Sequence, residues 1–160
     1  MNVRIGQGFD VHAFAGNRRL ILGGADIPFH LGLAGHSDAD VLTHAVMDAL
    51  LGAAGLGDIG QHFPDNDSAY KDADSLMLLS QVMQHLEAEG WKVGNIDATI
   101  IAQEPKLALF IQTMRENLAG ALGVASWCVN IKATTTELLG FTGRKEGIAA
   151  MAVALIQSSS

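Results

Sequence analysis

Three side chains of types that bind metal ions fall in two short segments of the chain. Asp10 and His12 alternate along an extended segment, and His44 lies in a helical one. In a strand, residues two apart share a face and lie about 6–7 Å apart. Two imidazoles and a carboxylate suit Zn²⁺ and leave a fourth position open for substrate or water. The spacing alone leaves a second interpretation open, in which these are ordinary polar residues that satisfy one another.

The strand that would carry Asp10 and His12 has two different faces. One face is apolar and is predicted to be packed, whereas the other is bare glycine until it ends in the acid and the imidazole. Glycine there allows a ligand or another backbone to approach closely, although two polar caps at a strand end are the plainer interpretation. The apolar face consists of Val3, Ile5, Phe9 and Val11.

The helix that would carry His44 is predicted over roughly residues 38–54. Ser37 followed by Asp40 resembles a capping box, which would start the helix at the serine. Asp40, His44 and Asp48 recur every four residues and therefore share one face. The loop at residues 57–67 is rich in carboxylates and is either a binding loop or a solvated loop with Asx-turns.

The remaining pattern predicts an α+β fold in a single domain, residues 1–160. A helix starts at Asp74-Ser75, and strand, helix and strand over residues 96–134 form a right-handed parallel crossover. The unbroken apolar run Ile148–Ile156 is predicted to be a buried helix. We expect a small mixed four-stranded sheet with helices on one face. Because no second layer covers the other face, a cyclic oligomer is expected.

Composition excludes several classes of function. The chain has 160 residues, of which 49% are hydrophobic, and a net charge of −7, which argues against nucleic-acid binding. No apolar run reaches the length of a membrane span, and no motif indicates a phosphate-binding loop or a nucleophilic serine. The single cysteine, Cys128, is expected to be a buried inert thiol rather than a nucleophile. A cytoplasmic location, or a plastid-like compartment, is expected.

Five separated motifs resemble the family of 2-C-methyl-D-erythritol 2,4-cyclodiphosphate synthases. They cover most of the chain in the right order, and their agreement is more specific than any one of them. The motifs are RIGQGFDVH (4–12), AGHSDADV (34–41) with His44, GDIGQHFPD (57–65), TIIAQEPK (99–106) and IKATTTELLGFTGRKEGIA (131–149).

The resemblance implies an intramolecular phosphoryl transfer in the non-mevalonate isoprenoid pathway. The 2-phosphate of 4-diphosphocytidyl-2-C-methyl-D-erythritol 2-phosphate attacks the β-phosphorus of the diphosphate, so that CMP leaves and a cyclic diphosphate forms. The chain would thus be a phosphorus–oxygen lyase. Since the nucleophile belongs to the substrate, catalysis reduces to positioning and charge neutralisation. A zinc phosphohydrolase and a non-catalytic trimer that senses isoprenoid diphosphates are the alternatives.

The resemblance also implies roles for individual residues. Asp10, His12 and His44 would hold Zn²⁺, and Glu137 would bind a second divalent cation, Mg²⁺ or Mn²⁺. His36 and Thr135 would be catalytic, stabilising the transition state. The substrate would be bound by Asp10, His12, His36, Ser37, Asp58, Ile59, Gly60, Phe63, Pro64, Asp65, Asn66, Asp67, Ala102, Gln103, Glu104, Pro105, Lys106, Leu107, Ala108, Thr134, Thr135, Thr136, Glu137, Phe141 and Arg144.

The assembly implied is a homotrimer with active sites between its subunits and no nucleic-acid or membrane partner. Phe141 and Arg144 would line the threefold axis, where family members can trap an isoprenoid diphosphate. A plain ion pair between subunits is an equal interpretation of Arg144. Lys145 stands where many relatives have a smaller residue, which would alter the charge near the axis.

Overall fold

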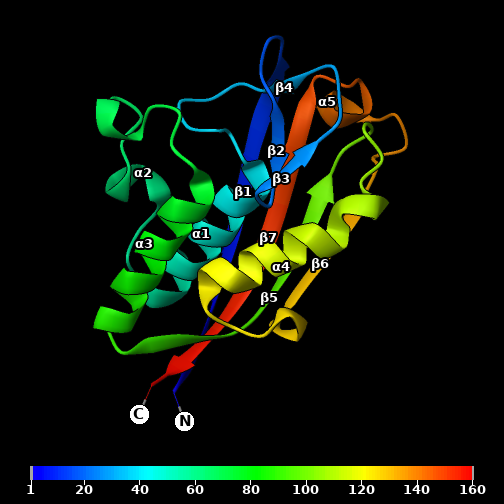
Figure 1. Ribbon diagram of the computed structural model, residues 1–160. Coiled ribbons are helices and arrows are strands. Elements are labelled where there is room, and N and C mark those ends of the chain that lie inside the picture. The colour runs from blue at the N-terminus through cyan, green and yellow to red at the C-terminus, as the bar shows by residue number, and fades with distance from the viewer. Residues whose placement is uncertain (1, 160) are drawn as a thin grey trace.

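The computed structural model describes residues 2–159 and places helices against a mixed sheet (Figure 1). The main sheet is five-stranded, in the order β4-β1-β7-β5-β6. Its strands are β1 (Val3–Ala15), β4 (Gly32–Leu33), β5 (Trp91–Ile101), β6 (Val129–Thr134) and β7 (Gly147–Ser158). A separate two-stranded sheet pairs β2 (Leu20–Leu22) with β3 (Ala25–Ile27). The predicted strand at residues 19–22 therefore lies outside the main sheet.

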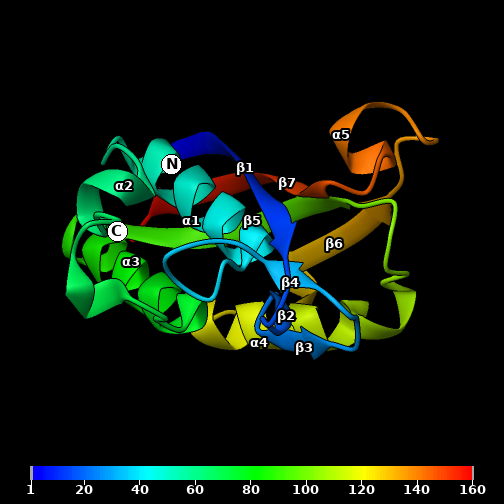
Figure 2. The same cartoon turned by 90° about the horizontal axis from the view of Figure 1, so that it is seen from above.

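The longer helices lie together on one side of the main sheet (Figure 1). The hairpin of β2 and β3 contacts α4 (Figure 2), where Asn117 Nδ2 donates to the Gly23 carbonyl at 3.1 Å. Both views place α5 where β7 begins, away from α2 and α3. The helices are α1 (Val41–Ala54), α2 (Ile59–His62), α3 (Ser75–Ala88), α4 (Ile111–Leu122) and α5 (Gly140–Gly143), with 3₁₀ turns η1 (Ser68–Tyr70), η2 (Ala108–Phe110) and η3 (Ser126–Cys128).

The α+β class and the parallel crossover are confirmed. β5 and β6 run parallel and are joined through α4, whereas β7 pairs antiparallel with both β1 and β5. The prediction of four strands was wrong, because the run Ile148–Ile156 is part of strand β7 and not a helix. Met151 and Val153 are exposed while the alanines beside them are buried. The sequence shows no alternation of polar and apolar residues that would indicate a strand, because the exposed residues of this run are as apolar as the buried ones.

The two faces of β1 are reversed relative to the prediction. Its apolar face is the exposed one in the chain, with Ile5 73% and Phe9 50% exposed. The glycine face packs directly on α1: a Cβ atom on Gly6 would fall 2.0 Å from the carbonyl oxygen of Ala49. The close approach expected at these glycines is therefore made by the protein's own helix.

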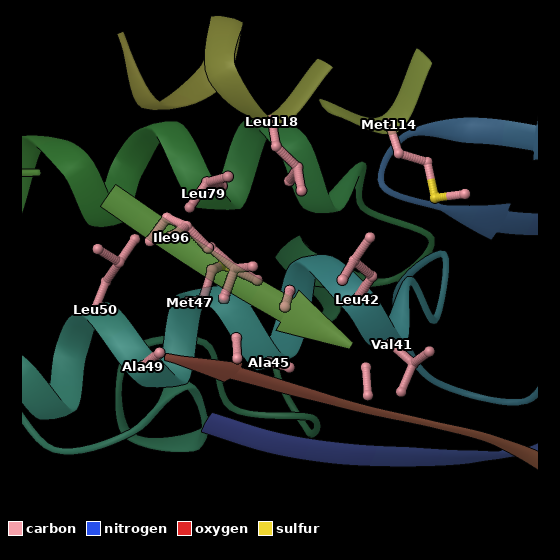
Figure 3. Packing of buried hydrophobic residues seen from close by; sticks show 14 of the residues in the cluster. Val41, Leu42, Ala45, Met47, Ala49, Leu50, Leu79, Ile96, Met114 and Leu118 are labelled. Atoms are coloured by element: carbon pink, nitrogen blue, oxygen red, sulfur yellow. The ribbon is translucent and has the colours of Figure 1, made fainter. Parts of the chain in front are cut away.

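Helix α1 lies in the middle of the core and is buried on nearly every side. Figure 3 shows Ala45 and Ala49 on the side of α1 next to β7 and β1, and Leu50 on the opposite side. Beyond it, Leu79 of α3 and Leu118 of α4 complete the cluster, and both are fully buried. Close packing around α1 fixes the position of the helix, and with it the position of His44, which lies on the same face as the partly exposed Asp48. Among residues 2–159, no helix combines the length and the apolar character needed to cross a bilayer.

Candidate metal centre and nucleotide pocket

Asp10 and His12 of β1 meet His44 of α1. The carboxylate oxygen Asp10 Oδ2 lies 2.9 Å from His12 Nε2 and 3.1 Å from His44 Nδ1, and the two nitrogens are 3.4 Å apart. Within residues 2–159, these three form the one group of His, Cys, Asp or Glu side chains whose ligand atoms are close enough to share a metal ion. One carboxylate and two imidazoles are a donor set typical of catalytic zinc sites.

The histidine nitrogens that face away from the cluster are also bound. His12 Nδ1 donates to the Ala34 carbonyl at 2.7 Å, because a carbonyl can only accept. That bond leaves the Nε2 lone pair of neutral His12 facing Asp10 and His44. On His44, Nε2 lies 2.9 Å from Ser75 Oγ and 3.2 Å from Ser37 Oγ.

The charges of the cluster shift two pKa values in opposite directions. Burial raises the pKa of Asp10, but hydrogen bonds from His12 and His44 and their charge outweigh burial, and the pKa falls well below its ordinary range. Burial lowers the pKa of His12, but the Asp10 carboxylate outweighs it, and the net shift is upward from 6.5. Asp10 would therefore offer an ionised carboxylate to a metal, and His12 would have to release a proton to bind one.

A pocket of about 130 Å³ opens beside the cluster. Most of the phosphate and sugar contacts predicted between residues 10 and 67 line this pocket. Met47, Tyr70 and Leu78 also line it and were not predicted. Tyr70 is the single tyrosine of the chain and packs edge-on against Phe63 at 5.2 Å, which its position after the carboxylate-rich loop could have suggested. The lining residues are Asp10, His12, His36, Ser37, His44, Met47, Ile59, Gly60, Phe63, Asp65, Tyr70 and Leu78.

His36 is held from both sides. Its Nε2 donates to the Asp67 carbonyl at 2.9 Å, and its own carbonyl accepts the Asp72 amide at 2.8 Å. Arg18, which the sequence did not single out, donates from Nη1 to the Gly35 carbonyl at 3.0 Å and from Nη2 to the Ser37 carbonyl at 2.7 Å. The guanidinium thus bridges the residues on either side of His36.

The helix start predicted at Ser37 was wrong, since Asp40 is the N-cap of α1 and accepts the Thr43 amide at 3.0 Å. The carboxylate of Asp40 also accepts the amides of Gly23 and Gly24 and is fully buried. Every oxygen of this acid is therefore used inside the fold, and the hydroxyl of Ser37 is free to face His44.

The carboxylate-rich loop divides into lining residues and structural residues. Asp58 caps α2 through the Gln61 amide, and Asp67 caps η1 through the Ala69 amide. Asp48 of α1 accepts the Ile59 amide at 2.9 Å and so fixes the loop to the helix that carries His44. Of the predicted sugar contacts, Asp58, Pro64, Asn66 and Asp67 do not line the pocket.

A second pocket, of about 290 Å³, lies at the ends of β5 and β6. It gathers nearly all the predicted nucleotide contacts and shares no lining residue with the first pocket. Glu104 is not among its lining residues and pairs instead with Lys145 at 3.0 Å. The lining residues are Ala102, Gln103, Pro105, Lys106, Leu107, Ala108, Ile111, Ala133, Thr134 and Thr135.

The predicted residues after Thr135 do not join the Asp10 cluster within the chain. Glu137 is exposed, has a φ of 54°, and donates its amide to Thr135 Oγ1 at 3.3 Å. Thr136 donates to the Leu139 carbonyl at 2.6 Å and serves the turn. Arg144 pairs with Glu146 of the same chain at 2.7 Å, and Phe141 on α5 is 40% exposed.

Comparison with known proteins decides the family. Residues 3–157 match the YgbB family. The chain belongs to this family. It is 64% identical over 157 residues to the 2-C-methyl-D-erythritol 2,4-cyclodiphosphate synthase of Thioalkalivibrio sulfidiphilus, covering 98% of each chain. It is 62% identical over 155 residues to the synthase of the same name from Thiobacillus denitrificans, covering 97% of each.

A solved structure agrees with the fold of the chain. The IspF of Plasmodium falciparum, in a CDP complex, superimposes with a TM-score of 0.87 at 31% identity and covers 99% of this chain and 98% of its own. The family resemblance read from the five sequence motifs is thus confirmed across the chain.

Proposed function

We propose that the protein converts 4-diphosphocytidyl-2-C-methyl-D-erythritol 2-phosphate into 2-C-methyl-D-erythritol 2,4-cyclodiphosphate and CMP. The observation that carries the proposal is the cluster of Asp10, His12 and His44 beside a pocket lined by the family motifs. Membership of the YgbB family and relatives above 60% identity support it. The chemistry needs no protein nucleophile, in keeping with a pocket lined by no cysteine.

Zinc is the metal we assign to Asp10, His12 and His44, and the donor set fits it. Both metal-facing nitrogens, His12 Nε2 and His44 Nδ1, lie within 3.1 Å of the Asp10 carboxylate. Both far nitrogens have hydrogen-bond partners, as metal-bound imidazoles almost always do. When bound, the ion would neutralise and polarise a substrate phosphate oxygen, which a chain of net charge −7 needs.

The chain's own residues bind and orient the substrate. His36 and Ser37 stand beside the cluster in the first pocket, where the Ser37 hydroxyl can donate to a phosphate oxygen and the His36 ring, fixed by the Asp67 carbonyl, lines the same wall. Ile59, Gly60, Phe63 and Asp65 form the wall assigned to the erythritol. The second pocket is assigned to the cytidine and its phosphate, with Lys106 supplying positive charge. Support comes from relatives of the chain that are solved in CDP complexes.

A homotrimer with sites between subunits explains two features of the chain. The exposed face of β1 and β7 is apolar over adjacent strands, and Phe9 is directly paired with Met151. Such a patch is typical of an interface. The second feature is that the two pockets share no lining residue within one chain. In the trimer, Thr135 and Glu137 of one chain would complete the metal pocket of a neighbour. Glu137 is the ligand we assign to Mg²⁺ or Mn²⁺.

Product identification tests the reaction. Purified protein with zinc, Mg²⁺ and the cytidylyl substrate should release CMP and the cyclic diphosphate in equal amounts, as followed by ³¹P NMR. CMP with a linear diphosphate would identify a hydrolase and overturn the proposal. Absence of turnover, with zinc and an isoprenoid diphosphate still bound, would identify a non-catalytic sensor instead.

Mixing inactive variants tests the shared site. His44→Ala removes one half of the proposed site and Thr135→Ala the other, so each variant alone should be nearly inactive. If the halves belong to different subunits, mixed trimers contain some intact sites and regain activity. Mixing that restores no activity, with heterotrimers shown by native mass spectrometry, would contradict sites between subunits. Phe141 and Arg144 at the axis, and an isoprenoid diphosphate bound there, stay predictions.

A further inference from the structure

A chain of three polar side chains leads from the candidate metal cluster through buried Ser75 to the partly buried Asp38. His44 Nε2 lies 2.9 Å from the hydroxyl oxygen of Ser75, and the Ser75 hydroxyl donates to Asp38 Oδ1. His44 comes from α1, Ser75 is the first residue of α3, and Asp38 lies in the connection between His36 and α1. Ser75 is fully buried, so no water competes for its hydroxyl.

The carboxylate sets the direction of every hydrogen bond in this chain. An ionised carboxylate can only accept, and Asp38 already accepts the amides of Asp40 and Ser75, both at 3.1 Å. The single hydroxyl proton of Ser75 is therefore committed to Asp38. Its oxygen is left to accept a hydrogen bond from His44 Nε2–H. In neutral His44 the proton thus sits on Nε2 and the lone pair on Nδ1, the nitrogen that faces Asp10.

We propose that Ser75 and Asp38 are positioning residues for His44, which fix the tautomer and ring orientation that a metal requires. The inference rests on the metal site assigned under the proposed function. The pair does for His44 what the Ala34 carbonyl does for His12, whose Nδ1–H it accepts at 2.7 Å. Neither residue touches the pocket, and no sequence motif considered above includes Ser75.

Ser37 is the weaker partner of the same nitrogen. Its hydroxyl oxygen lies 3.2 Å from His44 Nε2 and also accepts the Ala39 amide at 3.2 Å. Among residues 2–159 no carboxylate or carbonyl acceptor fixes the direction of the Ser37 hydroxyl, and Ser37 lines the pocket. We therefore assign the tautomer control to Ser75 and leave the Ser37 proton for a bound phosphate.

The test is the zinc dissociation constant, measured by competition with a chromogenic chelator on the full-length protein. Ser75→Ala removes the acceptor of His44 Nε2–H and should weaken zinc binding by about 10- to 100-fold. Ser75→Thr keeps the hydroxyl and should restore binding close to that of the wild type. Asp38→Asn should also weaken it, because a neutral amide oxygen accepts the Ser75 hydroxyl more weakly than the carboxylate does, and the amide N–H opposes the Ser75 amide, so the hydroxyl is no longer firmly committed away from His44.

Two neighbouring substitutions serve as matched controls. Ser80→Ala removes a hydroxyl of the same helix that donates to the Leu76 carbonyl, and Asp74→Asn changes the N-cap acid of α3. Both should bind zinc like the wild type. Thermal unfolding shows which variants are folded. If Ser75→Thr does not fold, the zinc affinity of Asp38→Asn decides the test in its place.

The outcomes separate this inference from the proposed metal site. If folded Ser75→Ala and Asp38→Asn both bind zinc as tightly as the wild type, the residues have only a structural role and the inference is wrong. If His44→Ala binds zinc as tightly as the wild type, the proposed metal site itself fails. Weak binding by Ser75→Ala together with tight binding by Ser75→Thr supports the inference.

Discussion

Gly8 of β1 lies against the carbonyl oxygen of Ala45 in α1, where a Cβ atom would come within 1.9 Å of that oxygen. Gly8 is two residues before Asp10, and Ala45 directly follows His44. The missing side chain lets strand and helix approach closely enough to bring Asp10 Oδ2 and His44 Nδ1 to 3.1 Å. The bare face of β1 is thus a packing requirement for the cluster of Asp10, His12 and His44.

Gly8→Ala should therefore damage both the fold and the site. The contact is with helix backbone, which cannot move aside, so we expect a loss of about 3 kcal/mol in unfolding free energy, the upper end for overpacked cores. Zinc binding should weaken with it. Urea denaturation measures the first effect and chelator competition the second.

Gly120→Ala is the matched control for Gly8→Ala. Gly120 lies in α4 with nothing near the position of an added Cβ atom. Alanine there should stabilise the protein by about 0.5–1 kcal/mol. Equal effects of the two substitutions would contradict the packing argument.

The Asp10–His12 pair makes the stability of the metal-free protein depend on pH. The pKa of His12 is raised above 6.5, so its contribution is fully present below that value and is lost as pH rises through the folded pKa. The pKa of Asp10 is lowered, so its contribution is present above its ordinary 3.8 and is lost only in strong acid. The difference in unfolding free energy between wild type and His12→Gln should be larger at pH 6 than at pH 9.

Asp10→Asn provides the control for this pH dependence. In that background the His12→Gln difference should no longer be larger at pH 6 than at pH 9, because the carboxylate that raises the pKa of His12 is gone and burial, which lowers it, remains. A difference that does not change with pH in the wild-type background would show that the pair does not form in the folded, metal-free protein.

Arg18 should affect catalysis without affecting zinc. Arg18→Ala frees the carbonyls of Gly35 and Ser37 and allows His36 to shift. Misplacement of a group that acts in the transition state lowers kcat by about 10- to 100-fold. Arg19→Ala, which removes an exposed pair with Asp26, is the control and should leave kcat unchanged. Equal kcat for the Arg18→Ala variant and the wild type would refute the role.

Lys145 should influence the nucleotide end of the site. Its ammonium lies 3.0 Å from Glu104, in the segment that carries the nucleotide pocket, and the expected change of charge near the axis stays a prediction. Both side chains are about half exposed, so the pair contributes at most about 1 kcal/mol. Lys145→Ala should raise KM no more than about fivefold. A double-mutant cycle with Glu104→Ala measures the coupling, and a large change in kcat would contradict this view.

The sequence predicted the three residues of the candidate metal cluster because their types suit a metal and the family motifs contain them, whereas their spacing alone left a second interpretation open. Asp10 and His12 share a strand face, and His44 follows at a helical position, so that the family resemblance and the geometry agree. The helix start predicted at Asp74-Ser75 also held, since Asp74 caps α3. Such signals are local and do not depend on what packs against them.

What the sequence could not predict depends on tertiary contacts. An apolar face does not reveal whether it meets the chain's own core or a neighbour, which is why the faces of β1 were reversed. The run Ile148–Ile156 has no alternation to distinguish strand from helix. Arg18 acts by bridging backbone carbonyls, and in the sequence it resembles any surface arginine. Ser75 acts through a buried hydroxyl, and in the sequence it resembles any residue at a helix start.

Reconstitution of metal-free protein tests the central claim most directly. With Mg²⁺ present, zinc is added in steps while the zinc content and the products are measured in the same samples. Formation of the cyclic diphosphate and CMP should rise in proportion to bound zinc up to one ion per chain, and His44→Ala should neither bind zinc nor turn over. Full turnover without zinc, or a linear product at full occupancy, would contradict the account.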